Sequence, residues 1–227
     1  MLENKSKIFF IDHAIWCFIF LLMSNTIAHA EVLHYSIQQL GIKAGNATLE
    51  FVGPAIYNNT DTLLVKFKAD GLNFLDQENI YLDKQSYRPL FVERRINIFG
   101  NKEEIVETYT PGQIKIVKTV SGKTTTQVIE KQGDIENIYG YIWRMRLEGQ
   151  FDVGKSVDIK LPTTDIAMKV VKLLSLNAAG KKFEAAYIQS EPSKYKIWFE
   201  AGGTHVPLRI AGAVGFGNTV MILSKIE

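Results

Sequence analysis

Apolar residues recur at every second position through most of the chain from residue 31 onward. Val65, Phe67 and Ala69, for example, point to one face of an extended chain, while the polar residues between them point to the other. This is the pattern of a β-strand with one buried face. The pattern recurs in segments such as 32–40, 103–109, 114–120, 124–129, 183–190 and 195–200, which are separated by turn sequences. A chain of about eleven such strands is confined to antiparallel β architectures.

The pattern changes once, between residues 135 and 148, where apolar residues recur at helical spacing. We expect an amphipathic helix there, with Asp134 as its N-cap and Gly149 just beyond its end. So many strands in one domain should curl into a half-open or closed barrel, or into a two-sheet sandwich. We favour a mostly β fold with one large curved antiparallel sheet and the helix near 135–148 on its concave side.

The first thirty residues follow the pattern of an export signal. Lys5 and Lys7 give a basic start, residues 8–23 are almost wholly apolar, and Ala28-His29-Ala30 supplies a small–x–small cleavage sequence. We therefore expect residues 1–30 to be a signal peptide cleaved after Ala30, and residues 31–227 to form a single β-rich periplasmic domain. The alternative for residues 1–30 is an uncleaved N-terminal membrane anchor. No later segment is apolar for long enough to be a transmembrane span.

Charge and cysteine usage exclude several classes of function. The formal net charge is only +2, and the charges are interspersed, which argues against a nucleic-acid partner. Cys17, the only cysteine, lies in the leader, so the remaining chain has no disulfide and no thiolate nucleophile or metal ligand. His34 and His205 have no partners at metal-ligand spacing. We expect no cofactor and no metal site.

Motifs for catalysis are weak. The chain has no G-x-S-x-G sequence, and the glycines of residues 212–217 run in the reverse order of the dinucleotide fingerprint. Carboxylates gather in an expected polar connection (Asp76, Glu78, Asp83) and on one expected strand (Glu103, Glu104, Glu107). A pair of them would serve a glycan-acting enzyme, but we favour the simpler explanation of a solvated loop and a charged outer strand face.

A few basic and aromatic residues are better candidates for a binding role. Arg94 shares a strand face with Val92 and Ile96, where it is costly unless it pairs with a glutamate such as Glu93 or Glu103, or grips an anionic group. Aromatic side chains beyond the needs of the core would line an apolar pocket. The candidates for a ligand pocket are Arg94, Trp143, Arg144 and Trp198.

Residues 41–49 (GIKAGNATL) resemble the G-I-x-A-G-x-A-x-L opening of an exported bacterial family, domain of unknown function 3108. Residues 141–144 (YIWR), 154–155 (GK), 197–199 (IWF), 206–210 (VPLRI) and 215–217 (GFG) are similar to later parts of that family, in the same order. Gly140 departs from a Ser–Ala pair that is frequent in the family's helix. The resemblance implies a β-rich domain of the Gram-negative cell envelope. It brings no activity, ligand or catalytic residue.

Three functions remain open on this basis. The first is a non-enzymatic periplasmic binding or carrier domain that holds a lipid or another apolar or amphiphilic molecule in the concavity of the sheet. The second is an envelope assembly or interaction factor that contacts an envelope protein through a strand edge or loops. The third is an enzyme acting on glycans, which we place behind the other two.

Overall fold

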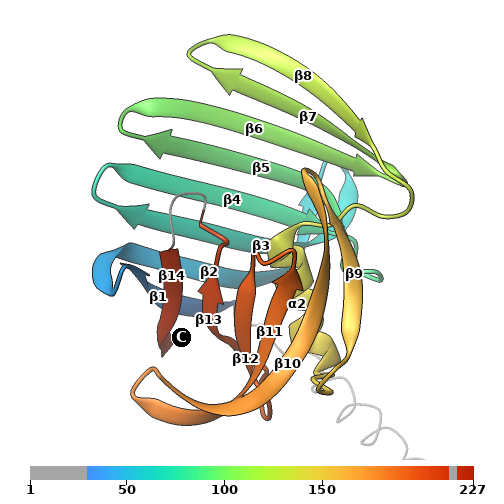
Figure 1. Cartoon of the computed structure of the whole chain (residues 1–227). Coiled ribbons are helices and arrows are strands. Elements are labelled where there is room, and N and C mark those ends of the chain that lie inside the picture. Colours follow the sequence, from blue (N-terminus) through green and yellow to red (C-terminus); the bar gives the residue numbers. More distant parts are fainter. Residues whose placement is uncertain (1–29, 215–218) are drawn as a thin grey trace, which may run out of the picture.

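The structure is a computed structural model that describes residues 30–214 and 219–227. Fourteen strands form one antiparallel sheet that is not closed. Strands that are neighbours along the chain pair with each other, except β8 and β9, which form the two ends of the sheet. In addition β1 pairs with β14, so the sheet order is β8-β7-β6-β5-β4-β3-β2-β1-β14-β13-β12-β11-β10-β9. Figure 1 shows this sheet curving strongly, with helix α2 on the inside of the curve. The expected curved antiparallel sheet with one helix is confirmed, in its half-open form.

The sheet has two arms that meet at β1 and β14. The first arm is β1 (Glu31–Gln39), β2 (Ile42–Tyr57), β3 (Thr60–Gly71), β4 (Phe74–Leu82), β5 (Pro89–Ile98), β6 (Asn101–Thr110), β7 (Gln113–Val120) and β8 (Lys123–Glu130). The second arm is β9 (Ser156–Leu161), β10 (Thr164–Ala178), β11 (Lys181–Glu191), β12 (Lys196–Glu200), β13 (Pro207–Ala211) and β14 (Thr219–Ile226). The helix α2 (Ile138–Glu148) lies in the connection between the arms.

The core lies on the face of the sheet against which α2 packs, which we call the inner face. Phe67 of β3 stacks on Tyr139 of α2 with ring centroids 4.3 Å apart, and both side chains are fully buried. Tyr35, Leu49 and Phe199 are also fully buried. Large side chains of this kind dominate core energetics, since each contributes about 1.5–3 kcal/mol when it leaves water. The helix therefore fills part of the concavity with its own side chains.

The helix begins later than the sequence indicates. Asn137, not Asp134, is the N-cap, and its side-chain oxygen accepts hydrogen bonds from the backbone N–H groups of Tyr139 and Gly140. Asp134 is instead ion-paired with Arg88. At the other end the expected Gly149 is confirmed as the C-cap, in the left-handed conformation that ends many helices.

Gly140 allows the helix to approach the sheet closely. A Cβ atom at this position would lie 3.1 Å from Cδ2 of Leu82 on β4, which is tighter than ordinary van der Waals contact. Glycine inside a helix costs about 1 kcal/mol relative to alanine. The close contact with β4 explains why glycine stands inside the helix despite this cost.

Two parts of the sheet differ from expectation. Residues 74–82 form β4, although the sequence indicated a polar connection around Asp76 and Glu78. Strand β2 also extends well beyond residues 47–52, over which its sequence indicates a strand, and it continues through a bulge near Gly53. The glycine run 212–217 lies partly outside the described residues.

Candidate ligand-binding site on the inner face of the sheet

A buried polar cluster lies on the inner face where β4 and β5 pass beneath the start of α2. Asp76 and Glu78 are two residues apart on β4, so both side chains point inward. Arg94 of β5 is the cross-strand partner of Glu78. Its Nε and Nη2 atoms donate to the two carboxylate oxygens of Asp76, at 2.8 and 2.6 Å. Such a two-pronged pair fixes the guanidinium in orientation as well as in charge.

Glu78 is the carboxyl whose chemistry is most altered by this setting. Burial raises the pKa of Glu78 to about 7, although the nearby charge of Arg94 and a hydrogen bond from Asn137 oppose the change. The Asn137 Nδ2 atom donates to Glu78 Oε1 at 2.6 Å, while the Oδ1 atom caps the helix. One asparagine side chain therefore couples the helix N-terminus to the buried acid.

The cluster continues onto β6 with a third carboxyl. Glu107 accepts a hydrogen bond of 2.5 Å from the Tyr109 hydroxyl, and burial raises the pKa of Glu107. Three carboxyls, those of Asp76, Glu78 and Glu107, thus share the positive charge of Arg94. Because one guanidinium cannot neutralise three carboxylates in a buried setting, Glu78 and Glu107 hold protons more readily than exposed glutamates do.

An aliphatic surface adjoins this cluster on the inner face of β5–β7. Its members are partly buried side chains that lie diagonally to one another on neighbouring strands: Ile96, Ile105, Ile116 and Val120. We call these four residues the inner-face strip. Beside them Lys118 pairs with Glu103 at 2.6 Å. The strip and the cluster together form an amphipathic surface, in which the aliphatic residues alternate with their charged cross-strand partners Arg94, Glu103, Glu107 and Lys118.

The structure does not bring the four sequence candidates into one pocket. Arg94 belongs to the buried cluster and pairs with Asp76, not with Glu93 or Glu103 as the sequence suggested. Trp198 lies on the other face of the sheet, where its ring stacks on that of Tyr187 with centroids 4.8 Å apart.

The remaining two candidates lie on α2. Arg144 is mostly buried and pairs with Glu136 at 2.6 Å and, more loosely, with Glu148. The Trp143 ring packs on Phe51 of β2, with centroids 4.4 Å apart. Trp143 lines a groove of about 540 Å³ at the C-terminal end of the helix.

That groove is closed by Arg146, whose guanidinium lies over the Phe51 ring at 4.9 Å and pairs with Glu31. Arg146 also donates to the backbone carbonyl of Thr204 at 3.0 Å. The contacts anchor the end of α2 to both arms of the sheet. The groove therefore lies where packed elements meet, and it is only partly open.

Two further features bear on the function. Within residues 30–214 and 219–227, no three histidine, cysteine or acidic side chains are placed so that they could share a metal ion. In the same part of the chain, no helix has the length and apolarity needed to cross a bilayer.

A comparison with protein families places this architecture. A family model described as "Protein of unknown function (DUF3108)" matches residues 33–224. The chain belongs to the DUF3108 family. The resemblance drawn from the sequence motifs is thereby confirmed, and the matched region includes all of β2–β13 together with α2.

Among solved structures, the DUF3108 fold is similar to the crystal structure of a beta-barrel-like protein of domain of unknown function DUF1849 from Brucella abortus. The TM-score is 0.52 at 10% sequence identity, and the match covers 87% of this chain and 97% of that chain. At this identity the likeness concerns the fold alone. Among curated proteins, none matches this DUF3108 chain.

The sequence indicates four members of the polar cluster, Asp76, Glu78, Arg94 and Glu107, but not that they lie together. Asp76 and Glu78 were noted as acidic residues of a connection, and neither Asn137 nor Tyr109 was singled out. A signal was present in residues 74–82, where Phe74 and Ile80 continue the two-residue period on either side of the two acids. Acidic residues that keep strand register with apolar ones indicate buried carboxyls as well as a strand.

Proposed function

We propose that this protein is an exported protein of the bacterial envelope that binds or carries an apolar or amphiphilic molecule on the inner-face strip. The observation that carries the proposal is the amphipathic surface of β4–β7. Aliphatic side chains remain half-exposed there, on the inside of a curved sheet that does not close. Half-exposed apolar side chains next to a few fixed polar groups are typical of ligand sites.

The polar cluster supports an amphiphile over a purely apolar ligand. Arg94 retains 28% of its side-chain exposure although Asp76 is almost fully buried, so the cluster is reached from the side of Arg94. A ligand with an alkyl tail on the strip would bring its headgroup toward Glu107 and Arg94. Protonated or shared carboxyls there would accept or donate hydrogen bonds without adding a large net charge.

The proposal is tested by native mass spectrometry of the protein recovered from the periplasm of cells that express the full chain. We expect a mature mass beginning at Glu31 and a co-purifying lipid or other amphiphile, released on denaturation and identified by extraction. A protein retained in the cytoplasm would contradict the export step. An exported protein without any bound amphiphile would contradict the binding step.

A matched pair of variants separates the inner face from the rest of the sheet. Ile105→Ser changes the inner-face strip, whereas Val106→Ser changes the next residue of β6, which faces outward. The assay follows how far added lipid displaces the apolar fluorescent probe N-phenyl-1-naphthylamine from the protein. We expect Ile105→Ser to reduce this displacement and Val106→Ser to leave it unchanged. Equal behaviour of two folded variants would exclude the strip as the binding surface.

A specific observation also favours an envelope assembly role as a second candidate. Strand β8 is bonded on one side to β7 and forms an end of the sheet, and its eight residues are almost all exposed. A free strand edge can pair with a strand of another protein. Photo-crosslinkers placed at Thr124 and Thr126 would capture a neighbour in the envelope under this hypothesis, and crosslinkers at Lys181 and Lys182 would not.

A further inference from the structure

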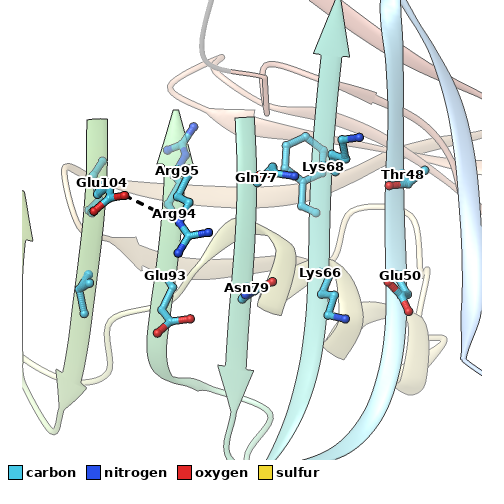
Figure 2. A pocket seen from close by; sticks show the side chains of 13 residues that line it. Thr48, Glu50, Lys66, Lys68, Gln77, Asn79, Glu93, Arg94, Arg95 and Glu104 are labelled. Atoms are coloured by element: carbon cyan, nitrogen blue, oxygen red, sulfur yellow. Dashed lines mark ion pairs between the residues drawn. The ribbon is translucent and has the colours of Figure 1, made fainter. Parts of the chain in front are cut away.

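The outer face of the sheet, opposite to α2, has a hollow of about 520 Å³ over β2–β6. Figure 2 shows that two rows of side chains cross it. The first row runs through the cross-strand neighbours Glu50, Lys66, Asn79 and Glu93. Five adjacent strands at a spacing of about 4.8 Å make the hollow roughly 19 Å wide. This is long enough for an extended ligand that lies across the strands.

The second row lies two residues further along each strand. It contains Lys68, Gln77, Arg95 and Glu104, which are cross-strand neighbours in that order. Arg95 and Glu104 make a loose ion pair of 4.0 Å, and Figure 2 marks it as a dashed line. These side chains are largely exposed, so the pair contributes little to stability and is free to rearrange around a ligand.

The charges that point into the hollow cancel. Its outward-facing charged side chains are three cations and three carboxylates: Lys66, Lys68, Arg95, Glu50, Glu93 and Glu104. A hollow with this balance has little net charge to attract polyanions or cations, and Lys68 is also paired with Asp70 at its edge, at 3.1 Å. It offers hydrogen-bond donors and acceptors in alternation, which suits a neutral ligand with many hydroxyl groups.

The centre of the hollow is formed by two amides of β4. Among the described residues, the side chains of Gln77 and Asn79 have no hydrogen-bond partner, and both point outward from neighbouring rows. An amide presents two donors and an acceptor to a ligand. Lys66 and Glu50 are likewise without a hydrogen-bonded or ion-paired partner among the residues that the structure describes. The central groups are therefore available for a ligand.

An aromatic shelf adjoins the hollow on the same face. The rings of Tyr57, Tyr81 and Phe91 pack together, with Tyr57 centroids 4.3 and 4.6 Å from the other two. Tyr81 and Phe91 are cross-strand neighbours one row beyond Asn79 and Glu93. The Tyr57 hydroxyl donates to Glu93 at 3.2 Å and so joins the shelf to the hollow.

We propose that this hollow and its aromatic shelf bind a neutral oligosaccharide lying across β2–β6. Sugar hydroxyls both donate and accept, so they match the alternating amide, ammonium and carboxylate groups, and the apolar face of a sugar ring stacks on an aromatic ring. Glu93 holds a position between the two parts of the site. This site is on the opposite face of the sheet from the inner-face strip, and it is independent of amphiphile binding.

The test is isothermal titration calorimetry of the purified protein with two neutral six-sugar chains, one of β-1,4-linked N-acetylglucosamine and one of α-1,4-linked glucose. We expect saturable binding of at least one of them in the millimolar range or tighter. The double variant Gln77→Ala/Asn79→Ala should bind about tenfold more weakly or worse, because two hydrogen-bonding amides are lost. Tyr81→Ala should also weaken binding.

The control is Thr124→Ala/Thr126→Ala, which removes two polar side chains from the outer face of β8, away from the hollow. We expect it to bind sugar as the unmodified protein does. All the changed residues lie on the surface, and an unchanged thermal midpoint would verify folding. Absence of saturable binding to both sugar chains, unaltered affinity of the double variant, or binding of an acidic peptide in place of the sugars would overturn the proposal.

Discussion

The buried carboxyl of Glu78 makes a quantitative prediction about stability. Burial raises the pKa of Glu78 from 4.5 to about 7 in the folded protein. Below pH 4.5 both the folded and the unfolded chain hold the proton, and the residue costs nothing. As the pH rises toward 7, the unfolded chain releases the proton while the folded protein retains it, so the free energy of unfolding falls. Above pH 7 the cost is constant, on the order of 3 kcal/mol.

Glu78→Gln removes this titration and keeps an acceptor for Asn137. We expect the variant to gain stability relative to the unmodified protein by on the order of 3 kcal/mol more at pH 8 than at pH 4.5. The attraction of Arg94, 3.7 Å away, acts on the ionised form of Glu78 and is already included in the pKa of about 7, so it needs no separate correction in this difference. The measurement is urea unfolding, followed by tryptophan fluorescence, at the two pH values.

Glu104→Gln is the matched control, since it removes a carboxylate of the same sheet that is 69% exposed. We expect its stability relative to the unmodified protein to change little between the two pH values. If the curves of Glu78→Gln and of the unmodified protein run parallel between pH 4.5 and 8, then Glu78 does not carry a raised pKa. The account of the cluster as a set of partly protonated acids would then be wrong.

Two further predictions concern the same cluster and can be checked by urea unfolding at pH 7. Asn137→Ala loses both the helix cap and the hydrogen bond to a buried acid, so we expect the free energy of unfolding to fall by about 2–4 kcal/mol. Asp134→Ala, at the cap indicated by the sequence, removes a surface ion pair and should lower it by at most about 1 kcal/mol. Arg94→Met leaves the buried Asp76 unpaired and should cost about 3–5 kcal/mol, whereas Arg95→Met on the outer face should change stability by less than about 0.5 kcal/mol. Equal costs for Asn137→Ala and Asp134→Ala would contradict the assignment of Asn137 as the N-cap. Equal costs for Arg94→Met and Arg95→Met would contradict the assignment of inner and outer faces.

The period-two pattern was sufficient to predict a curved antiparallel sheet but not β4. Two consecutive inward positions of β4 hold acidic residues, because Asp76 and Glu78 stand where Val or Ile would be expected. The sequence of β4 alone gives no indication that Arg94 lies on the neighbouring strand, where it can pair with both acids. The identity of the buried site was therefore hidden in the pairing of two strands, which local sequence does not specify.

The start of the helix is a second feature that the local sequence does not specify. Its existence and its end at Gly149 followed from apolar spacing and from glycine chemistry. Its start did not, because Asp134 and Asn137 are both good N-caps. A tertiary contact decides between the two residues: Asn137 donates a hydrogen bond to Glu78. Capping propensities describe the local sequence and do not include such a contact. Likewise, the sequence correctly indicates Arg94 as an unusual residue, but its partner Asp76 lies on β4, the strand that the sequence does not predict.

The pairing of β1 with β14 has a kinetic consequence. All other neighbouring strands in the sheet are also neighbours along the chain, so each arm can form by closing short loops. The joint between the arms, where Leu33 meets Ile226, closes a loop of nearly the whole described chain. Loops of this length raise contact order and slow folding. We expect a circular permutant that links β14 to β1 and opens the chain before β9 to keep the same sheet and to fold faster, because its slowest contact has become a local one.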